Sequence, residues 1–257
     1  MNILELKDAC MKFGGLSACT DLNFAIGSNE LLGMIGPNGA GKTTVFNMIT
    51  GVYKPTEGNV IFSGKEISGL RPYHIAALGI ARTFQNIRLF SNLTVFENVQ
   101  VSLNKNLKHG FSHSIFRFKS FHDEEKSVGK TIDEILDIFN LLHVKNELAT
   151  SLPYGDQRRV EIIRALATKP KLLLLDEPAA GMNPTEKVEL MSLIRSLRDR
   201  FNIAILLIEH DMKVVMGICE RIIVLDYGIK IAEGNPQQIK SNPKVIEAYL
   251  GEQVPTH

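Results

Sequence analysis

The stretch Leu31–Thr43, LLGMIGPNGAGKT, decides the fold. An apolar segment over Leu31–Ile35 predicts a strand, and Thr44–Thr50 predicts the helix that follows. Between them, GPNGAGKT matches the phosphate-loop pattern G-x-x-x-x-G-K-[ST]. Its glycines allow successive backbone N–H groups to curl around phosphate oxygens, and the next helix presents its positive end to the same charge. The stretch therefore predicts a nucleoside triphosphate site at a strand–helix junction.

Two side chains of this loop have predicted roles toward the phosphates. Lys42 is expected to bridge the β- and γ-phosphates, and the Thr43 hydroxyl is expected to bind Mg²⁺. The residues predicted to contact the nucleotide in and beside the loop are Gly36, Asn38, Gly39, Ala40, Gly41, Lys42, Thr43 and Thr44.

A second chemical pattern lies in LLLLDE, in which an apolar strand over 171–176 ends in two acids. Asp176 is placed to bind the Mg²⁺ shell, and Glu177 to polarise a water in line with the γ-phosphate. Alone the pattern is weak, because many strands are followed by solvated charges. In a chain that also carries a phosphate loop, it favours catalysis.

The order of apolar strands and amphipathic helices after residue 151 predicts a parallel sheet covered on both faces. We expect an α/β fold: a P-loop NTPase core with a mostly parallel sheet, an N-terminal antiparallel β subdomain with short strands at 3–7 and 22–26, and an inserted α-helical subdomain. The predicted division of this single 1–257 domain is a nucleotide-binding core at 1–84 and 159–234, a helical insertion at 85–158 and a C-terminal helical extension at 235–257.

Composition restricts the class of protein. The chain has 257 residues, 44% of them apolar, and a net charge of +1, so nothing in its bulk electrostatics points to nucleic acid or an anionic bilayer. Its three cysteines lack metal-ligand spacing and indicate free thiols. The N-terminus does not resemble a signal peptide, and no apolar run approaches the roughly 20 residues that cross a bilayer. We expect a soluble protein whose membrane link is a partner.

The segment LPYGDQRR (152–159) resembles the signature L-S-G-G-Q of the ATP-binding cassette (ABC) ATPases. In that family the glycine-rich helix start contacts the γ-phosphate held by the other subunit, a role that falls here on Gly155. Pro153 stands at the serine position and supplies no hydroxyl. Asp156 stands at the glutamine position, where a ribose hydroxyl, Arg158 or a simple helix cap are open alternatives.

Four further segments match that family in the same order. Gln85 in RTFQN is similar to the glutamine that touches Mg²⁺ or the attacking water, and His210 in IEHDM to the histidine that bonds the γ-phosphate. Ala180–Asn183 takes the place of a loop at the dimer contact. Phe13 corresponds to the aromatic residue that stacks on adenine. Taken alone, each also has a structural reading as a surface glutamine, structural histidine or core phenylalanine.

Longer segments narrow the resemblance: RTFQNIRLFSNLTVFENV (82–99), the LPYGDQRR form of the signature, DEPAAGMNPTE (176–186), IEHDMKVVMGICERIIVLDYG (208–228) and the ending VIEAYLGE (245–252). They resemble bacterial importers of branched-chain amino acids, specifically the larger of their two ATP-binding subunits. It implies ATP and Mg²⁺, a second ABC ATPase that is identical or a paralogue, membrane permeases, a periplasmic amino-acid binding protein, and a peripheral place on the cytoplasmic face of the inner membrane. Two alternatives remain: a lipopolysaccharide-export ATPase, and a soluble cassette acting on nucleic acid or ribosomes. The aromatic and basic segment at 109–122 is read as an insertion near the membrane partner, not as a nucleic-acid site.

Overall fold

The computed structural model describes residues 1–103 and 119–250, with the side chains of 119–127 and 250 excluded. It forms two compact units. The first contains Met1–Arg82 and Lys171–His257, and the second contains Thr83–Pro170. Residues 109–118 of the segment predicted to lie near a membrane partner are outside the described residues. The functional division into nucleotide-binding core and signature subdomain stays a prediction.

A six-stranded sheet forms the centre of the first unit, in the order β10-β9-β3-β8-β7-β6. The last five strands of that order are parallel, and β10 is an antiparallel edge. Its strands are β3 (Leu31–Ile35), β6 (Ile80–Arg82), β7 (Leu172–Asp176), β8 (Ala204–Ile208), β9 (Arg221–Asp226) and β10 (Ile229–Gly234). Every residue of β3, β7 and β8 is buried, which explains why these strands are apolar apart from Asp176 at the end of β7. The predicted α/β class with a mostly parallel sheet is confirmed.

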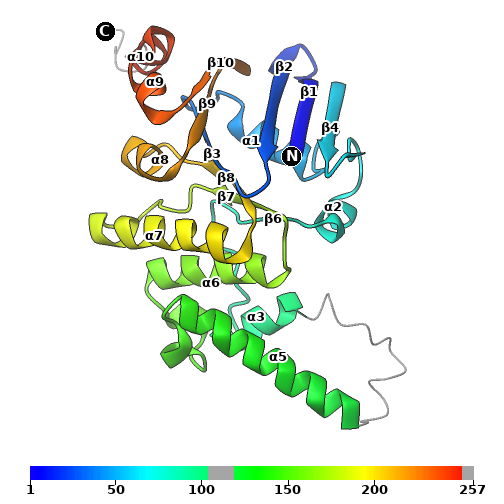
Figure 1. Ribbon diagram of the computed structural model, residues 1–257, viewed down its shortest axis with the longest axis vertical. Coiled ribbons are helices and arrows are strands. Elements are labelled where there is room, and N and C mark those ends of the chain that lie inside the picture. The colour runs from blue at the N-terminus through cyan, green and yellow to red at the C-terminus, as the bar shows by residue number, and fades with distance from the viewer. Residues whose placement is uncertain (104–118, 251–257) are drawn as a thin grey trace. The chain divides into compact units, whose positions relative to one another are not determined.

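Helices lie between the parallel strands along the chain, whereas β9 and β10 are joined by a tight turn (Figure 1). The helices of the first unit are α1 (Lys42–Ile49), α2 (Pro72–Leu78), α7 (Pro184–Phe201), α8 (Met212–Ile218), α9 (Pro236–Lys240) and α10 (Pro243–Leu250). Local signals set several of their starts. At α7, the Asn183 side chain accepts from the Glu186 N–H while Glu186 accepts from the Asn183 N–H, which is a capping box.

The second sheet of the first unit is antiparallel, in the order β2-β1-β4-β5. Its strands are β1 (Asn2–Phe13), β2 (Leu16–Gly27), β4 (Glu57–Phe62) and β5 (Lys65–Glu66). The antiparallel subdomain is confirmed, but its first two strands are 12 residues long where short ones were expected. Register shifts interrupt their pairing, and such bulges break the alternation by which strands are recognised in a sequence.

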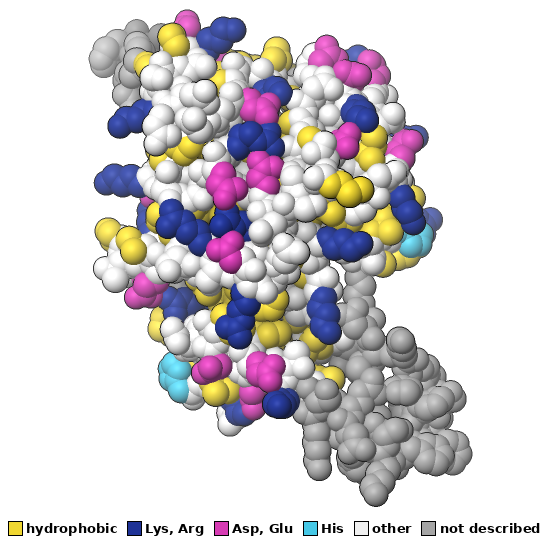
Figure 2. Space-filling view, in the orientation of Figure 1, with side chains coloured by type: hydrophobic (Ala, Val, Ile, Leu, Met, Phe, Trp, Pro, Cys, Tyr) yellow, Lys and Arg dark blue, Asp and Glu magenta, His cyan; other side chains and the backbone are white. Residues whose placement is uncertain are grey.

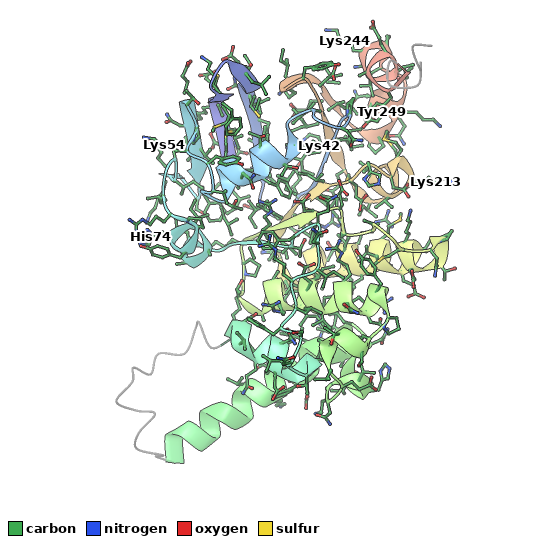
Figure 3. The ribbon with its side chains drawn as sticks, turned by 180° about the vertical axis from the view of Figure 1, so that it is seen from behind. Lys42, Lys54, His74, Lys213, Lys244 and Tyr249 are labelled. Atoms are coloured by element: carbon green, nitrogen blue, oxygen red, sulfur yellow. The ribbon has the colours of Figure 1, made fainter. Side chains whose placement is uncertain are left out.

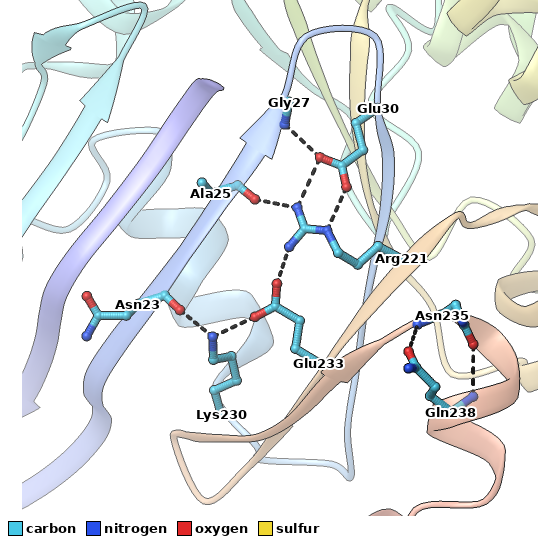
Figure 4. A network of polar contacts seen from close by, with 9 residues as sticks. All are labelled: Asn23, Ala25, Gly27, Glu30, Arg221, Lys230, Glu233, Asn235 and Gln238. Carbon is cyan, nitrogen blue, oxygen red and sulfur yellow. Dashed lines mark hydrogen bonds and ion pairs between the residues drawn. The ribbon is translucent and has the colours of Figure 1, made fainter. Parts of the chain in front are cut away.

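A polar network joins the two sheets of this unit (Figure 4). The Arg221 guanidinium of β9 donates to both Glu30 carboxylate oxygens at 2.7 and 3.0 Å and to the Ala25 carbonyl at 2.6 Å. It also pairs with Glu233, which accepts from Lys230 at 2.6 Å. These hydrogen bonds and partner charges raise the pKa of Arg221. The ribbon β1–β2 is thus attached to the edge of the parallel sheet by bidentate, charge-assisted bonds.

The second unit is helical. It contains α3 (Val95–Leu103), α5 (Lys119–Ile138), two short 3-10 turns (Leu142–Val144 and Ala149–Ser151) and α6 (Tyr154–Ala167). Helix α3 contacts both α5 and α6. The buried side chains of these helices include Val99, Leu136 and Ile162, and α6 is buried over more than one face, since 160–163 and 165–167 are all buried. The predicted helical insertion is confirmed as an element of the fold.

Acidic and basic side chains are interspersed on the face drawn in Figure 2. Among the described residues, none of the helices combines the length and apolar character needed to cross a lipid bilayer.

Candidate functional site

The phosphate loop follows β3 and owes its path to glycine. Gly36 and Gly41 have φ of 153° and 98°, which an L side chain rarely adopts. A Cβ at Gly36 would lie 2.1 Å from the Leu225 carbonyl oxygen, and one at Gly41 would lie 2.7 Å from the Ala18 oxygen. The loop therefore packs directly against the main chain of β9 and β2, and any larger residue at either position would displace it.

Lys42 opens α1, and its side chain lies back over the loop (Figure 3). Its ammonium donates to the carbonyl oxygens of Gly36 at 2.6 Å and Pro37 at 2.8 Å. Asn38 and Gly39, which lie between Pro37 and Lys42 in the sequence, are exposed, and Thr43 is exposed in the first helical turn. The cation, the exposed loop tip and the helix start thus lie together, as phosphate binding requires.

Asp176 ends β7 and is buried against an arginine. Its carboxylate accepts from Arg82 Nη2 at 2.8 Å, while Arg82 Nη1 donates to the Asn47 side chain at 2.7 Å. The Arg82 guanidinium also lies over the Phe46 ring, 5.3 Å from its centroid. One guanidinium therefore links the strand-end acid to α1, the helix of the phosphate loop. The sequence reading missed Arg82, although a cation directly before the TFQ segment was a visible signal.

Glu177 has φ of 47°, an uncommon conformation for a residue other than glycine. Its N–H donates to the Ile208 carbonyl of β8 at 2.9 Å, which holds this turn against the neighbouring strand. Its carboxylate lies 3.6 Å from Nδ1 of His210, which follows β8. The structure thus brings together two predicted site residues that are 33 positions apart by number (210 minus 177), at the carboxyl ends of adjacent parallel strands.

Glu209, next to His210, is a buried acid that the sequence reading did not single out. Its side chain is 1% exposed and accepts from the Ala179 N–H at 2.7 Å. Burial raises the pKa of its carboxyl group, against the opposing effect of its backbone hydrogen bonds. Glu209 therefore links the end of β8, directly before His210, to the segment that follows Glu177.

The raised pKa of Glu209 predicts a pH dependence of stability. The native state holds this proton more tightly than the unfolded chain, so native stability is lost as pH rises from the ordinary value of 4.5 toward the raised pKa. Glu209→Gln should remove that loss, which amounts to about 1.4 kcal/mol for each tenfold difference in proton affinity between the native and unfolded states. Urea denaturation of both proteins at several pH values between 4.5 and 8 measures it. The exposed Glu247→Gln is the control, and a difference between Glu209→Gln and wild type that does not change with pH would contradict the assignment.

Phe13 ends β1 and is 42% exposed. Its ring meets Tyr53 edge to face, with centroids 5.1 Å apart. An aromatic ring that is held on one side and open to solvent is suited to stack on a base. Its assignment to adenine stays a prediction.

The donors near the loop fit Mg²⁺. This ion prefers hard oxygen ligands and usually takes one or two protein oxygens together with substrate phosphates. The Thr43 hydroxyl and the Asp176 carboxylate are oxygens of that kind, carried by α1 and β7.

The remaining candidates belong to the second unit. Gln85 is exposed, and Gly155 lies in the first turn of α6. The Asp156 carboxylate lies 3.6 Å from Nη1 of Arg159. Pro153 is the N-cap of α6, with no side-chain capping bond. The nucleotide roles of Gln85, Gly155 and Asp156 stay predictions.

Pro153→Ser tests the altered signature. A serine hydroxyl at the start of α6 restores a donor for phosphate, and a net hydrogen bond of about 1 kcal/mol corresponds to roughly a five-fold rise in ATP turnover. Steady-state hydrolysis measures the change, and melting temperatures show that it does not arise from stability. Unchanged turnover would mean that the hydroxyl has no part in this cassette.

A phosphate loop after β3, an acid pair at the end of β7 and a histidine after β8 define a nucleoside triphosphatase of the P-loop class. Comparison with known proteins gives the family: a model described as "ABC transporter" matches residues 19–180, and one described as "Branched-chain amino acid ATP-binding cassette transporter" matches residues 230–255. The chain belongs to the ABC transporter family, whose ATP-binding subunits hydrolyse ATP. The resemblance seen in the sequence is confirmed.

Named relatives extend over the whole chain. The high-affinity branched-chain amino acid transport ATP-binding protein BraF of Pseudomonas aeruginosa is 46% identical over 97% of this chain and 98% of its own. LivG of Escherichia coli, with the same description, is 47% identical over the same shares. The lipopolysaccharide export system ATP-binding protein LptB of Haemophilus influenzae is 34% identical over 98% of this chain and 99% of its own.

Solved structures agree with the fold. An ATP-binding cassette of an ABC transporter in its ADP conformation has a TM-score of 0.85 at 33% identity, over 98% of this chain and 99% of that chain. A dimeric bacterial ABC transporter cassette has a TM-score of 0.76 at 27% identity, over 91% of this chain and 98% of that chain.

Proposed function

We propose that this chain is the ATP-hydrolysing subunit of an ABC importer for branched-chain amino acids. The observation that carries the cargo class is the 46–47% identity to BraF and LivG over 97% of the chain, together with the match at residues 230–255. The lower identity of 34% to LptB makes lipopolysaccharide export the second candidate.

The arrangement of the first unit supports hydrolysis by an activated water. Lys42 and the loop hold the triphosphate, and Glu177 acts as the base that takes a proton from the water. His210, 3.6 Å from Glu177, bonds the γ-phosphate and holds the carboxylate in place. Thr43 and Asp176 would hold Mg²⁺, which would supply positive charge to neutralise the phosphate oxygens.

The functional unit is a pair of cassettes. Each triphosphate is held by the loop of one protomer and by the Gly155 helix start of the other, so ATP stabilises the closed pair. A relative of known structure is a dimer, which supports this arrangement. The second protomer is an identical chain or a paralogue. Hydrolysis removes the bridging phosphate, and the pair opens.

The remaining partners follow from the importer. Membrane permeases receive the motion, a periplasmic binding protein delivers the amino acid, and the chain works as a peripheral subunit on the cytoplasmic face of the inner membrane.

Affinity purification from detergent-solubilised membranes tests the partners. We expect a tagged chain to bring down integral-membrane permeases, whereas ribosomes or nucleic acid would contradict the transport function.

Uptake of labelled leucine, isoleucine and valine tests the cargo: a strain lacking the chain should lose high-affinity uptake and regain it with the wild-type gene. Intact uptake with defective delivery of lipopolysaccharide would favour the second candidate.

A further inference from the structure

Helix α6 carries a buried ion pair one turn after its start. Arg158 Nη1 lies 2.8 Å from Glu161 Oε2, and the two side chains are 0% and 6% exposed. Removing two charges from water costs several kcal/mol per ion, and the attraction between them repays this only when further hydrogen bonds satisfy both groups. The pair therefore has to be understood through its other bonds.

Those bonds go to the main chain of Phe84 and Gln85. Glu161 Oε1 accepts from the Phe84 N–H at 3.1 Å. Arg158 Nη1 donates to the Phe84 carbonyl at 2.5 Å, and Nη2 donates to the Gln85 carbonyl at 2.7 Å. These three bonds reach three successive peptide units, so they fix the course of the main chain through Phe84 and Gln85. Two of them come from the two arms of one guanidinium.

The main chain here needs such partners. Residues 83–92 belong to neither helix nor strand, so no ladder satisfies their backbone groups. The side chains of Phe84 and Gln85 are nevertheless exposed. The ion pair thus fixes the position of the Gln85 main chain, while the Gln85 side chain remains exposed.

We propose that Arg158 and Glu161 are positioning residues that fix the main chain of Gln85 to α6, the helix whose first turn contains Gly155. The two nucleotide-contacting elements of this unit then move as one piece. This inference rests on the proposed function for the roles of Gln85 and Gly155. Neither charged side chain is assigned a contact with the reacting atoms.

An apolar replacement separates positioning from stability. Buried ion pairs exchanged for apolar side chains of similar volume often leave a protein equally stable. Such side chains fill the space but give no hydrogen bond to Phe84 or Gln85. The double variant Arg158→Met/Glu161→Leu should therefore fold and lose only the attachment. Arg158→Lys keeps the positive charge but lacks the second arm for the Gln85 carbonyl.

Two measurements read the outcome. Amide hydrogen exchange at Phe84 should quicken about 10–100-fold in the double variant, as expected for a lost hydrogen bond to a charged group. Turnover should fall about ten-fold or more while the KM for ATP stays within about two-fold, because a displaced Gln85 affects the transition state more than ground-state binding. Arg158→Lys should fall between the double variant and the wild type.

Lys145→Met is the control, since it breaks another ion pair of the same unit, the more exposed Lys145–Asp133 at 2.9 Å. A double variant with wild-type exchange and turnover would overturn the proposal. If the double variant does not fold, wild-type exchange and turnover in Arg158→Lys would overturn it equally. A wild-type protein without ATP hydrolysis would instead reject the proposed function, while exchange at Phe84 would still decide the attachment of the main chain.

Discussion

Replacing Glu177 by Gln is expected to cut ATP turnover by about 10²–10⁴-fold and leave ATP binding intact, the usual effect of removing a positioned base. Glutamine has the same shape, so it preserves the turn at φ 47° and the N–H bond to Ile208. It removes only the proton acceptor beside His210. Steady-state hydrolysis and equilibrium ATP binding measure the two effects separately.

A second readout follows from the proposed pairing of cassettes. ATP that binds but is not hydrolysed should hold the pair closed, so Glu177→Gln should shift toward dimer in gel filtration with ATP. Glu66→Gln, an exposed acid on β5, serves as the control and should behave as wild type. Near-normal turnover in Glu177→Gln would reject Glu177 as the base.

Lys42→Ala is expected to weaken ATP binding itself by about 10²-fold. The estimate assumes two charge-assisted hydrogen bonds to phosphate at about 1.5 kcal/mol each. Calorimetric titration with ATP measures the loss. Lys244→Ala, which removes an exposed lysine of α10, is the control (Figure 3).

The structure adds a complication to this experiment. The Lys42 ammonium also bonds the Gly36 and Pro37 carbonyls, so alanine loosens the loop as well as removing charge. Lys42→Arg separates the two effects, because it keeps the charge but not the compact geometry of an ammonium. Unaltered ATP affinity in Lys42→Ala would count against the loop as the phosphate site.

The sequence predicted those elements whose signals are local. Strand β3 lies directly before a glycine-rich loop and β7 directly before an acid pair, so both were placed within a residue of their observed bounds. Strand β6 has three residues and owes its existence to pairing with β7, 90 positions away by number (172 minus 82). A pairing partner that distant leaves no local pattern, so β6 was missed.

The site shows the same division. Motif residues such as Lys42 and His210 were predicted because the chemistry requires that residue type next to a strand end. Arg82 and Glu209 were not, and Arg158 was considered only as a partner of Asp156, because the importance of all three lies in contacts with segments far along the chain. Predicting them requires the tertiary structure.

Strand β3 lies between β8 and β9, yet it is made more than 160 positions before either of them (204 minus 35 is 169). During synthesis both edges of β3 stay unpaired until the last third of the chain has been made, and sheets that need such distant strands form slowly. The helical unit, in contrast, is one continuous segment, 83–170, and is complete before β8 exists. The nascent chain should therefore pass through an intermediate in which the helical segment is complete while β3 is still unpaired, and exposed apolar strands make such intermediates prone to aggregate.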